Sequence, residues 1–397
     1  MGDRILLFES RDLCYESNRY FMECLKEAFE NLGHPAKICD LSIRMEEKLE
    51  RALESREDYW FAMDFNSLLP RLRLEDGTPY LEALKLPFFN YLVDHPLYHH
   101  AGLQYQLSGY FVLCIDERHR DYIRKYYPHI KKAAYLPLGA MRAGMERGFD
   151  QKRLELLFLG TYEPEDALYQ ELAEYEEGQR KEISTLIEWM RDDDSLAPED
   201  ALVRYLDGQS IQLTEEEFVQ RLNRDYLADK YLRNLKRKEA VAAAAKAGIP
   251  FTVAGHGWET VKELTGAHVT LKKGVGFAAS LQLMANAKML LNTTPGFHGG
   301  FHDRVYSAMI NRTLCFTEDS PFAREMYRNG WETVLYGSGE QLAERLVLLH
   351  ENRNEIEEIA GRAYEQVLRF DTWEKRAERI LRLLEEDRKE IYDGNNL

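Results

Sequence analysis

One stretch indicates the fold class most clearly: Asn292-Thr-Thr-Pro-Gly-Phe-His-Gly-Gly-Phe-His-Asp-Arg-Val-Tyr-Ser-Ala-Met309. A short apolar run ends at Asn292, a glycine-rich loop follows, and a helical pattern begins near His302. Strand, turn and helix in this order are the repeating unit of α/β proteins with parallel sheets. Because ligands of such sheets bind beyond the carboxyl ends of the strands, the same stretch predicts a binding site.

Short apolar runs alternate with helical patterns along the rest of the chain as well. They predict one set of strands at 5–8, 59–65, 88–94, 110–116 and 133–138, and a second set at 154–160, 251–254, 269–271, 289–292, 313–317 and 333–336. Two sets of similar size predict an α/β protein of two Rossmann-like domains that face each other across a cleft.

The expected domains follow from these two sets. We expect a first domain over 1–145, a second over 146–370, and a C-terminal helix over 371–397 that packs back toward the first domain. Residues 163–247 are rich in Glu, Leu, Arg and Ala and hold no strand pattern, which predicts a helical insertion in the second domain. The densest basic run, at 230–238, has a helical pattern that favours a solvated face over an anion site.

Composition narrows the possible partners. The chain of 397 residues carries a net charge of −16, which disfavours nucleic acids and anionic membranes. No run approaches the roughly 20 apolar residues of a membrane helix, and the N-terminus lacks the pattern of a signal peptide. The five cysteines match no zinc or redox spacing. We therefore expect a cytoplasmic protein with reduced thiols and no membrane span.

The glycine-rich loop is the strongest candidate site. Backbone amides at Gly299 and Gly300 are available to an anion, and so is the start of the helix at His302. His302 itself is expected to form hydrogen bonds there.

Arg304 adds a planar cation that can bind two phosphate oxygens. The structural alternative is that Arg304 pairs with Asp303 or Glu318. His298 and His302 stand four residues apart, but no further residue completes a tetrahedral ligand set, so we expect no metal at this site.

Two other loops follow strands of the second set. They are Gly160-Thr161 and Gly255-His256-Gly257-Trp258. Glycines at strand ends let a ligand approach the backbone, and amides at a following helix suit phosphate. Trp258 offers a flat face for a nucleobase, or else it is a packed core side chain.

The first domain has one candidate of its own, Val93-Asp-His-Pro-Leu-Tyr-His-His100. The carboxylate of Asp94 and the imidazole of His95 at a strand end suit a general base. A buried structural turn is the alternative, and a proline turn would hold the three histidines poorly around a metal. The loop Glu9-Ser-Arg-Asp12 is a further place for a base.

The glycine-rich loop and the helix after it resemble a known family. The stretch 299–321 resembles the sugar-nucleotide half of GT-B glycosyltransferases, and most closely the bacterial spore-maturation-protein-like (CgeB-like) group. That group has a His-Asp/Glu-Arg-Val-Phe-x-Ala-Met helix followed by a Thr-Asp-x-Ser loop. The resemblance also covers residues 91–99, 135–139, 255–258 and 371–377.

The resemblance implies a nucleotide diphosphate donor, UDP-linked, bound by the second domain without a metal. Gly299, Gly300 and Arg304 would meet the diphosphate, and residues 256–258 would lie near the base or ribose. The full donor-binding set is predicted to be Gly160, Thr161, His256, Gly257, Trp258, Asn292, Gly299, Gly300, His302, Asp303 and Arg304.

The chain departs from the family pattern at two positions. Many retaining relatives carry glutamates where Ser307 and Gly299 stand, so ribose binding would fall to Asp303, His302 or another loop. If the transfer inverts the anomeric centre, Asp94 or His95 would be the base.

The resemblance implies a transferase of the hexosyl or N-acetylhexosaminyl type. It leaves the acceptor open, with proteins and polysaccharides among the candidates. Two alternatives stay open. A sugar-nucleotide 2-epimerase on the same fold would act on the donor without an acceptor. A coat or scaffold protein with a decayed donor site would not catalyse at all.

Overall fold

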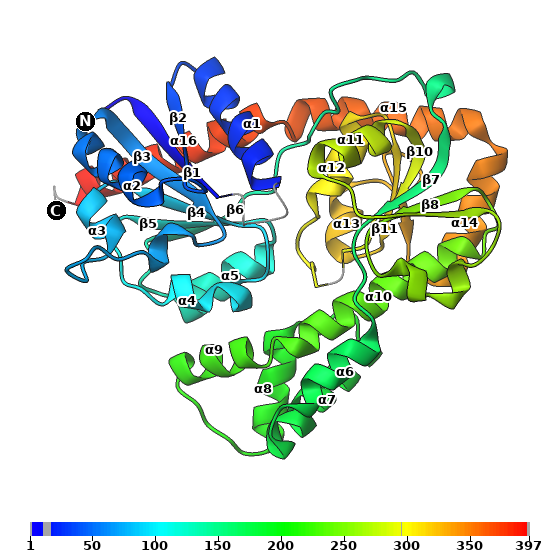
Figure 1. The fold of residues 1–397 in the computed structure, drawn as a ribbon, viewed down its shortest axis with the longest axis horizontal. Coiled ribbons are helices and arrows are strands. Elements are labelled where there is room, and N and C mark those ends of the chain that lie inside the picture. The colour runs from blue at the N-terminus through cyan, green and yellow to red at the C-terminus, as the bar shows by residue number, and fades with distance from the viewer. Residues whose placement is uncertain (1, 11–16, 295, 395–397) are drawn as a thin grey trace. The chain divides into compact units, whose positions relative to one another are not determined.

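A computed structural model describes residues 2–10, 17–294 and 296–394. The chain forms two compact units, each built around its own sheet (Figure 1). The first unit comprises Met1–Ala140 and Leu368–Leu397, and the second comprises Met141–Val367. The units therefore divide after residues 140 and 367, where the sequence pattern suggested 145 and 370.

The first unit contains a six-stranded, wholly parallel sheet in the order β2-β1-β3-β4-β5-β6. Its strands are β1 (Arg4–Glu9), β2 (Ala36–Asp40), β3 (Tyr59–Phe65), β4 (Phe88–Leu92), β5 (Tyr110–Cys114) and β6 (Lys132–Tyr135). Sequence patterns do not predict β2. It is an edge strand with only one buried side chain, and it therefore lacks the apolar run that marks its neighbours.

Helices flank this sheet, as the sequence predicts. They are α1 (Ser17–Asn31), α2 (Met45–Glu54), α3 (Tyr80–Leu84), α4 (His100–Leu103), α5 (Glu117–Tyr126) and α16 (Trp373–Gly394). The apolar face of α1 is buried through Phe21, Leu25, Ala28 and Phe29, and Gly33 follows the end of the helix with a φ of 86°. The C-terminal helix α16 packs against α1, where Trp373 contacts Phe21 with ring centroids 5.5 Å apart.

Two of the stretches that resemble the family, 135–139 and 371–377, form one structural junction in the first unit. Arg376 pairs with Asp371 at 2.6 Å and donates to the carbonyl of Leu138 at 3.3 and 3.2 Å. A Cβ on Gly139 would lie 2.6 Å from the ring of Trp373, so only glycine fits there. These residues fasten the tail to the stretch after β6, and they are explained by structure rather than by ligand contact.

The second unit has the same architecture. Its parallel sheet runs in the order β12-β11-β10-β7-β8-β9. The strands are β7 (Leu154–Leu159), β8 (Phe251–Ala254), β9 (Val269–Lys272), β10 (Ala287–Leu291), β11 (Leu314–Glu318) and β12 (Val334–Tyr336). The helices that accompany them are α11 (Phe277–Ala285), α12 (Asp303–Ile310), α13 (Pro321–Met326), α14 (Gly339–Glu351) and α15 (Arg353–Phe370).

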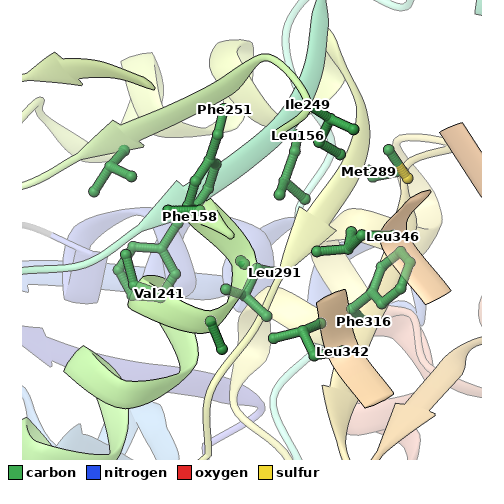
Figure 2. Close-up of a cluster of buried hydrophobic side chains, with 14 of the residues drawn as sticks. Leu156, Phe158, Val241, Ile249, Phe251, Met289, Leu291, Phe316, Leu342 and Leu346 are labelled. Atoms are coloured by element: carbon green, nitrogen blue, oxygen red, sulfur yellow. The ribbon is translucent and has the colours of Figure 1, made fainter. Parts of the chain in front are cut away.

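One face of this sheet carries the main core of the second unit (Figure 2). Phe158, Met289 and Phe316 of the strands belong to one cluster with Val241 of α10 (Leu227–Ala245) and Leu346 of α14, and all five are buried. Burying such side chains contributes about 1.5–3 kcal/mol each, so this cluster is a principal source of the unit's stability.

The region 163–247 is entirely helical apart from its turns. It contains α6 (Glu165–Ala173), α7 (Glu177–Asp192), α8 (Pro198–Gly208), α9 (Glu215–Arg224) and α10 (Leu227–Ala245). Helix α10 belongs to two cores. Its first half adds Leu227 and Leu232 to the core of the inserted helices, and its second half adds Val241 and Ala244 to the core of the sheet. Figure 1 shows this one helix connecting the insertion to the rest of the unit.

The cysteines that the structure describes are Cys24, Cys39, Cys114 and Cys315, and all four are free thiols. Burial raises the pKa of Cys24 to about 12 and that of Cys39 to about 11, so both stay protonated at neutral pH. Cys14 lies outside the described residues. No helix among the described residues is long and apolar enough to cross a membrane.

Candidate functional site

The carboxyl edge of the second sheet has a topological switch point between β7 and β10. From β7 the chain proceeds to β8 and β9 on one side, and from β10 it proceeds to β11 and β12 on the other. Loops leaving two such neighbours diverge, which opens a crevice where ligands of open α/β sheets bind. The glycine-rich loop follows β10, so the strongest sequence candidate lies at this point.

Arg304 spans the switch point. Its guanidinium donates to the carbonyl of Leu159 at 2.5 Å and to that of Thr293 at 3.4 Å, and its Nε donates to Asn292 Oδ1 at 3.3 Å. Three of its five N–H groups therefore fasten the end of β7 to the end of β10. These three N–H groups therefore have a structural role, which was the alternative to phosphate binding. Their partners are carbonyl oxygens and not the expected carboxylates of Asp303 or Glu318.

Asn292 is part of the same clamp. It is fully buried, and its Nδ2 donates to Thr317 Oγ1 at 3.1 Å. Its carbonyl accepts from the hydroxyl of Tyr336 at 3.0 Å. Asn292 was predicted to bind the donor, but the structure places it beneath the edge as a link between β10 and its neighbours.

His302 and Asp303 stand at the start of α12. His302 is the N-cap, and its Nδ1 accepts from the amide of Arg304 at 3.3 Å. Burial lowers the pKa of His302, and the positive charge of Arg304 lowers it further, so the imidazole is neutral at pH 7. Burial acts to raise the pKa of Asp303, but the adjacent His302 and Arg304 outweigh it and hold the net pKa low. The imidazole is 36% exposed, so it is accessible to a ligand.

The basic run 230–238 lies against this edge, which the sequence prediction of a solvated face missed. Arg237 of α10 donates to the carbonyl of Thr161, in the loop after β7, at 2.6 Å. Arg233 lies beside the glycine-rich loop, because a Cβ on Gly296 would approach its side chain to 3.9 Å. Burial lowers the pKa of Arg304, and the charge of nearby Arg233 contributes to that shift.

At least four of the five basic side chains of this run also pair with an acid among the described residues. Arg233 pairs with Asp229 at 3.5 Å, and Lys236 pairs with Asp194 at 2.5 Å. Their side chains are only about a quarter exposed, which distinguishes them from a solvated helix face. No sequence signal shows that this face of α10 turns toward the loops after β7 and β10.

The loop after β8 is held closely to the loop after β7. A Cβ on Gly255 would lie 1.9 Å from the carbonyl oxygen of Gly160, and one on Gly257 would lie 2.0 Å from that of Tyr162. Both glycines are required by this close approach. His256 between them is exposed and remains accessible, as does Thr161.

Trp258 is a packed core side chain, which was the alternative to a face that binds a nucleobase. It is 1% exposed, its indole N–H donates to the carbonyl of Gly160 at 2.6 Å, and its ring stacks on Tyr162 at 5.1 Å. The expectation that it offers a face to a nucleobase is therefore wrong, because Tyr162 and Phe158 already cover the ring.

Ser307 and Asn311, both on α12, have a structural task. Ser307 Oγ accepts from the amide of Met141 at 3.1 Å, and Asn311 bonds to the backbone of Met141 and Ala143 at 2.8 and 2.9 Å. The position where many GT-B relatives carry a glutamate thus anchors residues 141–143 here. Among the described residues, no three His, Cys, Asp or Glu side chains gather as metal ligands would.

His95 and Asp94, the two candidate bases of the first unit, have different surroundings. His95 is buried, and its Nδ1 accepts from the amide of Leu97 at 3.0 Å, which caps the 3₁₀ turn Pro96–His99. Its ring lies edge-on to His119 at 4.5 Å. The general-base role predicted for His95 is therefore corrected to that of a cap, because the nitrogen that would accept a proton is already bonded.

Asp94 remains a candidate base. It follows β4 and is partly buried, and its Oδ2 accepts from Asn66 Nδ2 at 3.3 Å. Of the loop Glu9-Ser10-Arg11-Asp12, the last two residues lie outside the described residues. Glu9 and Ser10 are buried at the end of β1.

Several solved structures match nearly the whole chain. HepE of Anabaena, in complex with UDP and glucose, has a TM-score of 0.55 at 10% identity, covering 97% of this chain and 100% of that one. Sucrose-phosphate synthase of Thermosynechococcus elongatus has a TM-score of 0.55 at 10% identity, with 97% and 98% covered. AviGT4, a glycosyltransferase involved in avilamycin A biosynthesis, has a TM-score of 0.51 at 14% identity, with 96% of each covered.

The chain has the GT-B fold. The two Rossmann-like domains predicted from the sequence are thereby confirmed. A glycosyl transferase-like family profile matches residues 224–382 of this GT-B chain, a region that begins just before α10 and includes the glycine-rich loop and α12. No curated protein matches the chain.

Proposed function

We propose that this GT-B chain is a cytoplasmic glycosyltransferase of the CgeB-like group. It moves a hexosyl or N-acetylhexosaminyl group from a UDP-linked donor to a hydroxyl of a protein or glycan. The observation that supports this most is the gathering of cations and glycines at the switch point of the second sheet. The structural relative HepE was solved with UDP and glucose, which favours a UDP-linked donor.

The diphosphate would be held by α10 and α12 together. Arg304 uses three of its five N–H groups on uncharged backbone and side-chain oxygens and keeps its charge. Arg233, which is paired with Asp229, and Arg237 would supply further N–H groups to the diphosphate. The N-terminus of α12, with Gly299 and Gly300 before it, adds backbone N–H groups that favour an anion. Charges fixed in this way stabilise the leaving diphosphate, and in this proposal they take the place of a metal ion.

The acceptor side of the reaction is assigned to Asp94. If the anomeric configuration inverts, its carboxylate removes the proton of the acceptor hydroxyl as the new C–O bond forms and UDP leaves. If the configuration is retained, the same side chain positions the acceptor sugar.

The experiment that tests this function is product analysis with UDP-glucose and UDP-N-acetylglucosamine in the presence of EDTA. Released UDP, with water or an added glycan taking the sugar, supports a transferase. A donor altered at C2 with no UDP released identifies an epimerase. A chain that leaves every donor unchanged is the non-catalytic scaffold, a reading favoured by the missing carboxylates at Gly299 and Ser307.

A further inference from the structure

Two consecutive residues at the end of β3 have left-handed backbone. Asn66 has a φ of 55° and Ser67 a φ of 60°. Residues other than glycine seldom adopt this conformation, and such residues gather at functional sites where the surroundings enforce them. The pair lies at the carboxyl edge of the first sheet, between the strand and the turn Leu69–Arg71.

Ser67 is enforced by a buried network. Its amide donates to Asn90 Oδ1 at 3.0 Å, and its hydroxyl accepts from Asn90 Nδ2 at 2.8 Å. Asn90 also donates to the hydroxyl of Tyr110 at 2.8 Å. A Cβ on Gly102 would lie 2.4 Å from that of Ser67, so the chain closes tightly over this residue. These hydrogen bonds and this close packing hold Ser67 in its left-handed conformation.

Asn66 uses this conformation to hold the loop after β4 at three points. Its amide donates to the carbonyl of Tyr91 at 3.1 Å, and its Oδ1 accepts from the amide of Val93 at 3.0 Å. Its Nδ2 donates to Asp94 Oδ2 at 3.3 Å. One side chain thus fixes both the backbone that leads to Asp94 and one oxygen of its carboxylate.

We infer that Asn66 is the positioning residue for Asp94: its left-handed backbone and its amide side chain set the direction in which that carboxylate meets an acceptor hydroxyl. The inference rests on the proposed function, in which Asp94 serves the acceptor. A hydrogen bond to one oxygen of a carboxylate fixes the orientation of that carboxylate.

Two substitutions separate the parts of this role. Asn66→Gly keeps the left-handed backbone and removes both side-chain bonds. Asn66→Asp keeps an oxygen for the amide of Val93, removes the donor to Asp94 and sets a like charge beside it. Lys85→Gly is the matched control, because Lys85 is exposed and also left-handed, with a φ of 56°.

The test combines hydrogen exchange with kinetics on the full chain. Amide exchange over residues 91–98 is followed by mass spectrometry, and UDP release from UDP-glucose gives kcat and KM. In Asn66→Gly, exchange at Val93 should be about tenfold faster. In Asn66→Asp, this exchange should stay near that of the wild type, while kcat falls at least about tenfold and KM for the donor changes less than about twofold. Lys85→Gly should change none of these values.

Unchanged exchange in Asn66→Gly, or a wild-type kcat in Asn66→Asp, would overturn the inference. Loss of UDP affinity in either variant would also overturn it, because Asn66 would then support stability in general. Failure of the proposed function looks different. The wild type would release no UDP from any donor, and the exchange rates would still decide whether Asn66 holds the loop of Asp94.

Discussion

The two sheets of this molecule are built alike and differ at their carboxyl edges. Each has six parallel strands and one switch point, between β1 and β3 in the first sheet and between β7 and β10 in the second. The edge of the second sheet carries glycines and cations, with Arg304 across the switch point and Arg233 and Arg237 beside it. The edge of the first carries a carboxylate, Asp94, held by the left-handed Asn66. Shared architecture fixes where the groups lie, and local side chains decide what each edge binds.

The largest expected effect concerns the first edge. Asp94→Asn removes the proposed base but preserves its size, so kcat for sugar transfer should fall about 10²–10⁴-fold. UDP affinity should be unchanged, since the second sheet holds the nucleotide in this account. Steady-state kinetics and calorimetry of the same preparation measure both values. A variant with full turnover would remove Asp94 from the chemistry.

Arg304 tests the second edge in a different way. Arg304→Met should lower the free energy of unfolding by about 3 kcal/mol, because carbonyls of β7 and β10 lose their donors while remaining buried. Urea denaturation gives this value. Arg353→Met is the control. The Arg353 side chain is 62% exposed, and Glu155, its partner at 3.6 Å, keeps its ion pair with Lys288, so the loss should cost little. If Arg304→Met is as stable as the control but cannot bind UDP, the clamp is a ligand site instead.

A smaller effect is expected from His99 in the first unit. Burial lowers the pKa of His99 from 6.5 to about 4, with Asp94 opposing this shift and Arg71 and His95 reinforcing it. The unfolded chain therefore binds more protons between these two pH values, and stability is lost as pH falls from about 6.5 to about 4. The slope should be about 1 kcal/mol per pH unit at most. Unfolding curves of wild type and His99→Gln across this range measure it, and parallel pH dependences would contradict the assignment.

Sequence patterns predict most of the fold for a simple physical reason. Strands such as 59–65 and 251–254 are buried on both faces, so they appear as continuous apolar runs with clear ends. The edge strand β2 lacks this signal because most of its side chains are partly exposed.

The site was less predictable because its roles depend on tertiary contacts. The sequence identifies the glycine-rich loop and Asp94, which follow strands directly. It does not show that Arg304 is engaged by carbonyls, that His95 caps a turn, or that α10 turns Arg237 toward Thr161. An Asn-Ser pair after a strand is compatible with left-handed backbone, but only the packing around Ser67 shows that it is used.

The most direct test of the account is calorimetric titration of UDP, in EDTA, into the wild type and into Arg237→Met, with Lys246→Met as the control. Lys246 is exposed at the end of the same helix. Wild type and control should bind UDP alike, and Arg237→Met should bind it about tenfold or more weakly, because a charge-assisted contact contributes about 1.5–3 kcal/mol. Equal affinity in all three proteins, or no binding by the wild type, would contradict a nucleotide site at the switch point of the second sheet.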